Sequence, residues 1–396
     1  MKKIFYFFRI LWNIFYLFLD ILKLTIILFK KKRYKVFLQT EGGFGHTISE
    51  PHYLNITEKE NWLLIIAFDR NFHNKLVKNV FNKKIIFINK TSIFWRYKNE
   101  IEKLIVNIFK ILYSIEIRLV QSYIMEKNYT IKSNNYHKCF ESREFLEFYK
   151  NKNHSLYKNF LDNNDYSKIL SKFKNFKGLV NFQIRLKAKL TGTSDNFSRF
   201  RDSEHIDFYK PVVDAIIDKG WVIIFGGDEF DIPDWLYNHD ERIIFKKKTK
   251  LSKDSYGFFA GIVSDIYIGP PSGGAMFNLI NPKKKQLLIN CIPFGFGLIN
   301  SVSAYPIISF DDKNDFKKVF ERNIVDRFNF NFYEDRLVRK LNSNEVRDIV
   351  LDFLNNINRN YGLSHKDLDI KNGIIEDTDF KVSEKWLDLI NYKYLK

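Results

Sequence analysis

Short apolar runs alternate with helical segments between residues 178 and 290, and this alternation limits the possible folds more than any other feature. The helical segment at residues 205–219 is amphipathic, and Gly220 is well placed to end it. The runs show little polar alternation, which is typical of strands buried on both faces of a parallel sheet. The pattern therefore predicts a doubly wound α/β fold. The runs are residues 178–184 (GLVNFQI), 221–225 (WVIIF), 242–245 (RIIF), 265–268 (DIYI) and 286–290 (QLLIN).

The N-terminal half repeats the pattern more weakly, with apolar runs at residues 34–40, 62–68 and 84–88. A length of 396 residues also favours two domains over a single core. The chain has only two cysteines, which excludes a disulfide framework and a zinc cluster. We therefore expect two Rossmann-like domains with appendages at both ends. The expected parts are an amphipathic membrane-associating helix with a basic run at residues 1–33, an N-terminal domain at 34–172, a C-terminal domain at 173–330 and a charged helical tail at 331–396.

The first 33 residues point to a membrane surface. Residues 3–29 are strongly apolar but interrupted by charges, and one narrow polar stripe with apolar flanks suits a helix lying in the membrane interface. A spanning helix and a core helix stay open as alternatives. The basic run at residues 30–33 (KKKR) would bind anionic lipid on the cytoplasmic side. On a helical wheel the polar residues fall within an arc of about 80°: Arg9, Asn13, Tyr16, Asp20 and Lys23.

The formal net charge of +18 raises the question of a nucleic-acid partner. The sequence is rich in Lys, Asn, Ile and Phe, as an AT-biased genome would produce, and it contains no recognisable nucleic-acid-binding module. A membrane surface or a phosphate-bearing substrate accounts for positive charge equally well. We therefore expect no nucleic-acid partner.

Ligands of open α/β sheets bind outside the carboxyl ends of the strands, so the residues after each run are the candidates for a site. The loop at residues 269–275 (GPPSGGA) follows a run and opens onto a helix expected from Met276. Its small residues suit a phosphate, through Ser272, Gly273 and Gly274, although an ordinary turn explains them as well. The loop lacks the Gly-Lys-Ser/Thr of a Walker A motif.

Two arginines are candidate phosphate ligands, because guanidinium binds phosphate bidentately and keeps its charge. Arg185 directly follows the run at 178–184, and Arg201 lies in the loop after it. Surface ion pairs are the alternative for both. Asp202 in the same loop belongs either to an acid/base group or to a helix cap. The turn after the run at 221–225 could contact a ribose or base, or simply turn the chain, through Gly226, Gly227 and Asp228.

These motifs resemble a family of bacterial glycosyltransferases with the GT-B fold, found among genes for surface polysaccharide and distantly similar to fucosyltransferase-like enzymes. The matching stretches are GGFGH at 42–46, VNFQIRL at 180–186, RFRDSEHIDFYKPVVDAIIDKGWVIIFGG at 199–227 and SDIYIGPPSGGAMFNLINPKKKQLLINCIPF at 264–294. The match covers residues 178–294 well and 34–53 weakly. Phe225 stands where the family often has an arginine, and Pro270 and Pro271 replace the usual Thr or Asn before the Ser-Gly pair.

The resemblance implies two facing Rossmann-like domains, with the nucleotide-sugar donor held by the C-terminal one. Transfer would be metal-independent and need no cofactor, and it would serve a lipid-linked or polysaccharide acceptor at the cytoplasmic face of the inner membrane, on a peripheral or single-helix anchor. Gly43 and Gly45 would approach the donor phosphates, and His46 or Glu41 would take the acceptor proton. Three alternatives stay open: a nucleotide-sugar epimerase, a polyol-phosphate transferase and a non-catalytic scaffold of the same fold.

Overall fold

The chain divides into two compact units, residues Met1–Phe148 and Tyr149–Lys396, and each is considered by itself. The computed structural model describes most of residues 164–186, 205–227, 231–279, 284–321, 338–370 and 381–395, together with residues 35–39, 62–67 and 85–88 and the single positions Leu19, Leu22 and Ile26.

The first unit contains a three-stranded parallel sheet in the order β1-β2-β3. Its strands are β1 (Lys35–Gln39), β2 (Trp62–Ala67) and β3 (Ile85–Ile88). These strands coincide with the three apolar runs of the N-terminal half, so the prediction of parallel strands there is confirmed. The arrangement of two facing domains stays a prediction.

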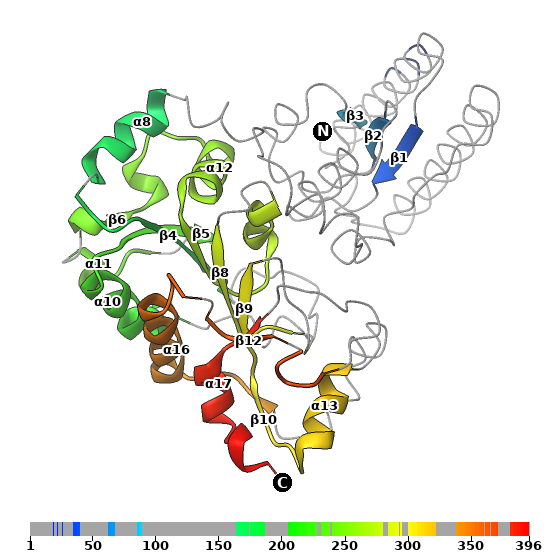
Figure 1. Cartoon of the computed structure of the whole chain (residues 1–396). Helices are drawn as coiled ribbons and strands as arrows, with labels where there is room; N and C mark the ends of the chain where they lie inside the picture. The colour runs from blue at the N-terminus through cyan, green and yellow to red at the C-terminus, as the bar shows by residue number, and fades with distance from the viewer. Residues whose placement is uncertain are drawn as a thin grey trace, which may run out of the picture. The chain divides into compact units, whose positions relative to one another are not determined.

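The second unit is built on an eight-stranded sheet in the order β12-β13-β9-β8-β7-β4-β5-β6 (Figure 1). All neighbours pair in parallel except β12 and β13. The mostly parallel, Rossmann-like α/β fold predicted for this half is confirmed. The strands are β4 (Leu179–Ile184), β5 (Val222–Gly227), β6 (Ile243–Ile244), β7 (Ile266–Gly269), β8 (Lys285–Ile289), β9 (Ser301–Ala304), β12 (Leu363–Ser364) and β13 (Lys381–Val382).

Helices cover both faces of this sheet, with α8 and α12 above the strands in Figure 1 and α10 and α16 below them. The α-helices among the described residues are α8 (Asn164–Leu170), α10 (Lys210–Asp218), α11 (Asp234–Tyr237), α12 (Lys253–Val263), α13 (Lys313–Glu321), α16 (Ser343–Asn355) and α17 (Glu384–Leu389). Shorter 3₁₀ helices are η3 (Ser171–Phe173), η5 (Ile206–Tyr209), η6 (Asp240–Arg242), η7 (Lys246–Lys248), η8 (Gly273–Leu279) and η9 (Tyr392–Tyr394). A separate antiparallel pair joins β10 (Ile307–Ile308) to β11 (Val338–Arg339).

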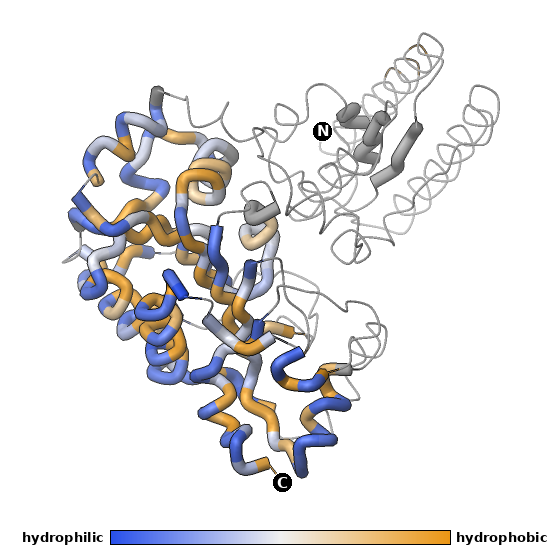
Figure 2. The backbone as a smooth tube through the Cα atoms, in the orientation of Figure 1, coloured by the Kyte–Doolittle hydropathy of each residue, from blue (hydrophilic) through white to orange (hydrophobic). Residues whose placement is uncertain are grey.

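The core fills both faces of the central strands, as expected for runs without polar alternation. On the α12 face, Val222 and Ile224 pack with Phe259 in one buried cluster. On the opposite face, the Phe182 ring meets Tyr209 edge-on at 5.2 Å and Phe225 at 5.8 Å. Figure 2 shows apolar residues along the central strands and hydrophilic stretches on the outer helices.

The segment expected to be a helical tail takes part in the sheet as well. Its strand β13 pairs in parallel with β9, and β12 pairs with β13. Trp386 of α17 is fully buried and contacts the rings of Phe294, Tyr305 and Phe320. These contacts make the tail part of the second unit, because its aromatic side chains complete a core around the end of β9.

The division between the units lies 24 residues before the predicted boundary at 172. Part of this difference is explained by the packing of α8 (residues 164–170), whose Tyr166 is 1% exposed. Its hydroxyl donates to the Ser255 carbonyl oxygen at 3.0 Å, and its ring lies 5.2 Å from that of Phe259. Helix α8 therefore belongs with α12 and the sheet of the second unit.

Candidate functional site

The order of the strands places a topological switch point between β4 and β7. From β4 the chain passes through α10 to β5 and then to β6 on one side, whereas β7 returns to the other side of β4 and leads on to β8 and β9. Adjacent strands therefore connect in opposite directions at this point. Open α/β sheets bind ligands in the crevice outside the carboxyl ends of such strands.

One side chain, Gln183 of β4, occupies the carboxyl ends of the three strands at the switch point. A Cβ added to Gly226 of β5 would stand 2.6 Å from Gln183 Oε1, and one added to Gly274 would stand 2.5 Å from it. A Cβ on Gly269 of β7 would stand 2.7 Å from Gln183 Cβ, and one on Gly227 would stand 2.6 Å from Nε2. Four glycines from three segments thus leave room for a single amide side chain.

Gly227 carries a stronger requirement than the other three. Its φ of +91° is in the region that favours glycine, and an added Cβ would stand 2.0 Å from the Ile184 carbonyl oxygen. A backbone carbonyl oxygen cannot move aside to relieve this clash, whereas the flexible end of a side chain can. The strand β5 therefore needs glycine at its last residue in order to end beside β4.

Two buried side chains, those of Tyr267 and Gln286, donate hydrogen bonds to backbone carbonyl oxygens of the loop after β7. Tyr267 donates from its hydroxyl to the Pro270 carbonyl oxygen at 2.7 Å, and its hydroxyl also lies 3.1 Å from Ser272 Oγ. Because the one phenolic hydrogen goes to Pro270, Ser272 is the donor to Tyr267. Gln286 of β8 donates from Nε2 to the Ala275 carbonyl oxygen at 2.8 Å.

The helix expected from Met276 begins earlier and is a 3₁₀ helix, η8. The Ala275 amide donates to the Ser272 carbonyl oxygen at 3.0 Å, an i to i+3 bond that tightens the turn. The Ala275 amide therefore donates within the loop, and the Ser272 hydroxyl donates to Tyr267 of β7. The loop therefore opens onto a 3₁₀ helix and not onto the expected α-helix, and the role of Ser272, Gly273 and Gly274 as phosphate ligands stays a prediction.

A row of polar side chains lies buried across four neighbouring strands beneath the loop. Asn181, Tyr267, Gln286 and Ser301 stand opposite one another in register, and none is more than 2% exposed. Among the described side chains, three polar atoms are buried without a hydrogen-bond partner: Asn181 Oδ1 and Gln286 Oε1 in this row, and Trp386 Nε1 of α17. Burial of an unpaired polar atom is costly, so each of these atoms calls for an explanation.

Asn181 also connects this row to Gln183. The point at which a Cβ on Gly226 would stand lies 2.6 Å from Asn181 Oδ1 and 2.6 Å from Gln183 Oε1. Two amide oxygens, one of them unpaired and deeply buried, therefore face the same glycine of β5.

The structure brings together part of the predicted site. Gly226, Gly227 and Gly274 meet around Gln183, while Gly273 begins η8 and Arg185 follows β4 with a half-buried side chain. The remaining candidates lie outside the described residues and stay predictions: Glu41, Gly43, Gly45, His46, Arg201, Asp202 and Asp228.

Sequence reasoning did not single out four residues of this site, which are Asn181, Gln183, Tyr267 and Gln286. A signal was present, because Asn and Gln interrupt runs that are otherwise apolar and expected to be buried on both faces. A buried polar residue is more informative than an exposed apolar one. Their meeting across strands could not be foreseen, since it depends on strand order and register.

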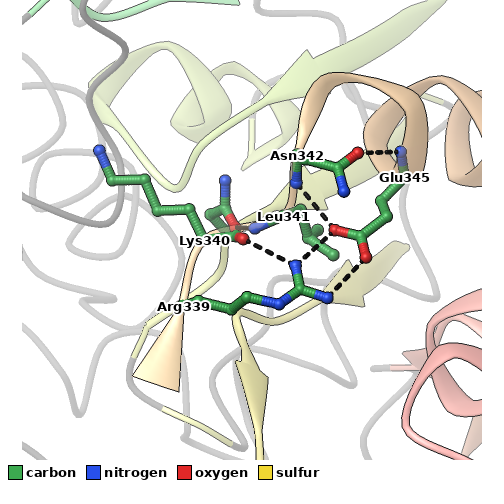
Figure 3. A network of polar contacts seen from close by, with 6 residues as sticks. Arg339, Lys340, Leu341, Asn342 and Glu345 are labelled. Carbon is green, nitrogen blue, oxygen red and sulfur yellow. Dashed lines mark hydrogen bonds and ion pairs between the residues drawn. The ribbon is translucent and has the colours of Figure 1, made fainter. Parts of the chain in front are cut away.

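A second polar network joins the carboxyl end of β8 to the start of α16 (Figure 3). Asn290, the residue after β8, accepts from the Leu341 amide at 3.0 Å. Asn342 caps α16 by accepting from the Glu345 amide at 3.0 Å, and Glu345 accepts from the Asn342 amide at 2.8 Å. Arg339 donates to both Glu345 carboxylate oxygens at 2.7 Å, and these bonds lower the pKa of Glu345.

Lys284 is buried at the opposite, amino-terminal end of β8. Its Nζ donates to the Gly261 carbonyl oxygen and to Ser264 Oγ, the latter at 2.7 Å, at the end of α12. Burial lowers the pKa of Lys284 to about 7, and Asp265 acts in the opposite direction. Because the strands are parallel here, the Lys284 amine lies at the opposite edge of the sheet from the switch point. Its hydrogen bonds go to acceptors at the end of α12.

No protein-family model matches the chain, and no curated protein matches it either. Among solved structures, a chain of MnaA from S. aureus in a co-structure with UDP aligns with 82% of this chain and 96% of its own length. The identity is 12% and the TM-score 0.32. At that TM-score the likeness supports no conclusion about fold or function.

Proposed function

We propose that this chain is a glycosyltransferase that moves a sugar from a nucleotide-sugar donor to a lipid-linked or polysaccharide acceptor in bacterial surface-glycan synthesis. The observation that carries the proposal is the glycine-lined amide site at the switch point of a Rossmann-like sheet, where such sheets bind nucleotides. The sequence resemblance to GT-B glycosyltransferases converges on the same residues, since Gly226, Gly227 and Gly274 all fall within the matching stretches.

The reaction proposed is direct transfer without a metal. An acceptor oxygen forms a bond to the anomeric carbon, the bond from that carbon to the diphosphate oxygen breaks, and the nucleoside diphosphate leaves with the electron pair. Arg185 and Arg201 stabilise the leaving charge in this proposal. His46, Glu41 or Asp202 takes the acceptor proton, and Gly43 and Gly45 approach the donor phosphates.

The proposed acceptor is presented at a membrane surface. Leu19, Leu22 and Ile26 are helical and expose 39%, 47% and 45% of their surfaces. Their spacing of three and four residues puts them on one face of a helix, as an interfacial helix requires. Among the residues that the structure describes, no helix is both long and apolar enough to cross a membrane.

A thermal-shift screen of the detergent-extracted full chain tests the donor site. The probes are UDP, GDP, CDP, ADP and dTDP with their common sugar conjugates, and a ligand at 100 times its dissociation constant stabilises a fold by about 2.7 kcal/mol. We expect a shift with one base that Arg185→Ala reduces. No shift with any probe would refute a nucleotide-sugar donor site.

Product analysis tests the reaction itself. The donor that stabilises the chain is incubated with and without a lipid extract, and the products are separated by mass. Acceptor-dependent release of the nucleoside diphosphate with a glycosylated lipid supports the transferase. A rearranged nucleotide sugar formed without any acceptor would replace it with the epimerase alternative.

A further inference from the structure

The four glycines at the switch point surround one side chain, and this arrangement points to a role for them other than the ligand contacts and turns expected from the sequence. Gly226, Gly227, Gly269 and Gly274 belong to three elements in two distant stretches of the sequence, yet each would place a Cβ within 2.7 Å of an atom of Gln183. Glycines needed only for turning the chain would not be expected to lie against the same side chain, Gln183. Gly226, Gly227 and Gly274 therefore leave room for the Gln183 amide, and Gly269 leaves room for its Cβ.

The two ends of that amide meet different surroundings. Oε1 faces the half-buried Gly226 and Gly274, whereas Nε2 lies next to Gly227, which is exposed. The donor end of Gln183 therefore faces the open side of the crevice.

Asn181 supplies an independent observation on the same site. Asn181 is 2% exposed, and its Oδ1 has no hydrogen-bond partner among the described residues. This oxygen and Gln183 Oε1 each lie 2.6 Å from the point at which a Cβ on Gly226 would stand. Two acceptor oxygens there repel an anion and leave the Nε2 side as the place for one.

We propose that Gln183 donates a hydrogen bond from Nε2 to a phosphate oxygen of the nucleotide-sugar donor, and that the surrounding glycines hold the amide in this position. The proposal rests on the proposed function and deepens it by naming the residue and the ligand group. Diphosphate oxygens are acceptors only, so they match a donor, and a hydrogen bond to a charged group is stronger than a neutral one.

The first test compares substitutions of similar size at Gln183. Binding of UDP, GDP, CDP, ADP and dTDP, and of the corresponding free nucleosides, is measured by calorimetry on the full chain in detergent. Gln183→Met removes the donor, and we expect about a tenfold to hundredfold loss of diphosphate affinity with nucleoside affinity unchanged. Gln183→Glu places a carboxylate against the phosphate and lowers the affinity further.

The Gln183→Glu variant decides between phosphate and hydroxyl groups as the partner. A carboxylate accepts hydrogen bonds from sugar hydroxyls, so an amide that contacted hydroxyls would tolerate this change. Diphosphate affinity equal to that of the unsubstituted chain, in either Gln183→Met or Gln183→Glu, overturns the proposal. Circular dichroism and the melting temperature confirm that each variant is folded.

A double-mutant cycle tests the role of the glycines. The Cβ of Gly274→Ala would displace the flexible end of Gln183, so this variant folds but binds the diphosphate more weakly. In the Gln183→Met background the same alanine should cost less than half of its original fold-change, because the amide that it displaces is already absent. An undiminished cost would mean that Gly274 contacts the ligand directly, and it would overturn the assigned role.

The outcomes separate this inference from the function on which it rests. A chain that binds none of the diphosphates refutes both. A chain that binds one of them with affinity independent of Gln183 refutes only the inference. Diphosphate binding through Gln183 without sugar transfer would refute the transferase and leave the inference intact.

Discussion

Raising the pH from 7 to 9 should stabilise the second unit through the buried amine of Lys284. Burial lowers the pKa of this amine in the folded chain to about 7, from 10.5 in its ordinary environment. The folded state therefore binds fewer protons than the unfolded state between these values, and the free energy of unfolding rises with pH in that window. The full difference is worth about 5 kcal/mol, of which about 2 kcal/mol is gained between pH 7 and 9.

The assay has to report the unfolding of the second unit alone within the full chain. Urea unfolding at pH 7, 8 and 9 is followed by pulsed deuterium labelling and read in peptides from β7 and β8. For a unit of this size about 2 kcal/mol raises the melting temperature by about 4–8 °C, which gives an independent reading. Tyr256 and Tyr361 do not interfere, because burial raises the pKa of both hydroxyls and their effect, of opposite sign, begins only near pH 10.

Lys284→Met is the matched control, since it keeps the length of the side chain without the titrating group. We expect its free energy of unfolding to lose most of the rise between pH 7 and 9. A flat profile in the unsubstituted chain, or an equal rise in Lys284→Met, would refute the reasoning. Either result would mean that the bonds to Gly261 and Ser264 keep the amine protonated in the folded state.

Three further variants test the cap of α16, the requirement for glycine at position 227 and the exposed helix face of the first unit. Asn342→Ala removes the cap of α16 and should cost about 1 kcal/mol, or about 2–4 °C in melting temperature; an unchanged melting curve would show that Glu345 alone suffices. Gly227→Ala forces a Cβ against the Ile184 carbonyl oxygen and should lower the melting temperature more than Gly274→Ala does, and the reverse order would contradict the backbone argument. Leu22→Asp on the exposed helix face should weaken cosedimentation of the full chain with anionic lipid vesicles, and equal sedimentation would argue against interfacial binding.

Much of the second unit could be predicted from local patterns. The apolar runs at 178–184, 221–225 and 286–290 became β4, β5 and β8, because their residues are buried on both faces and such burial leaves a clear mark in sequence. The segment after residue 331 was harder to predict. Its strands β11, β12 and β13 have two residues each, too few to show any periodicity. Each forms by pairing with a strand elsewhere in the chain: β11 with β10, β13 with β9 and β12 with β13.

For the candidate site, the sequence by itself determined the residue types and their placement after strands. Glycines at 226, 227 and 274 and the arginine at 185 could be selected because glycine and arginine carry specific conformational and charge properties wherever they occur. Only the tertiary structure decided that these glycines surround Gln183. That meeting depends on β4 lying between β5 and β7 in a given register, and strand order and register arise from contacts between distant segments, which no local pattern encodes.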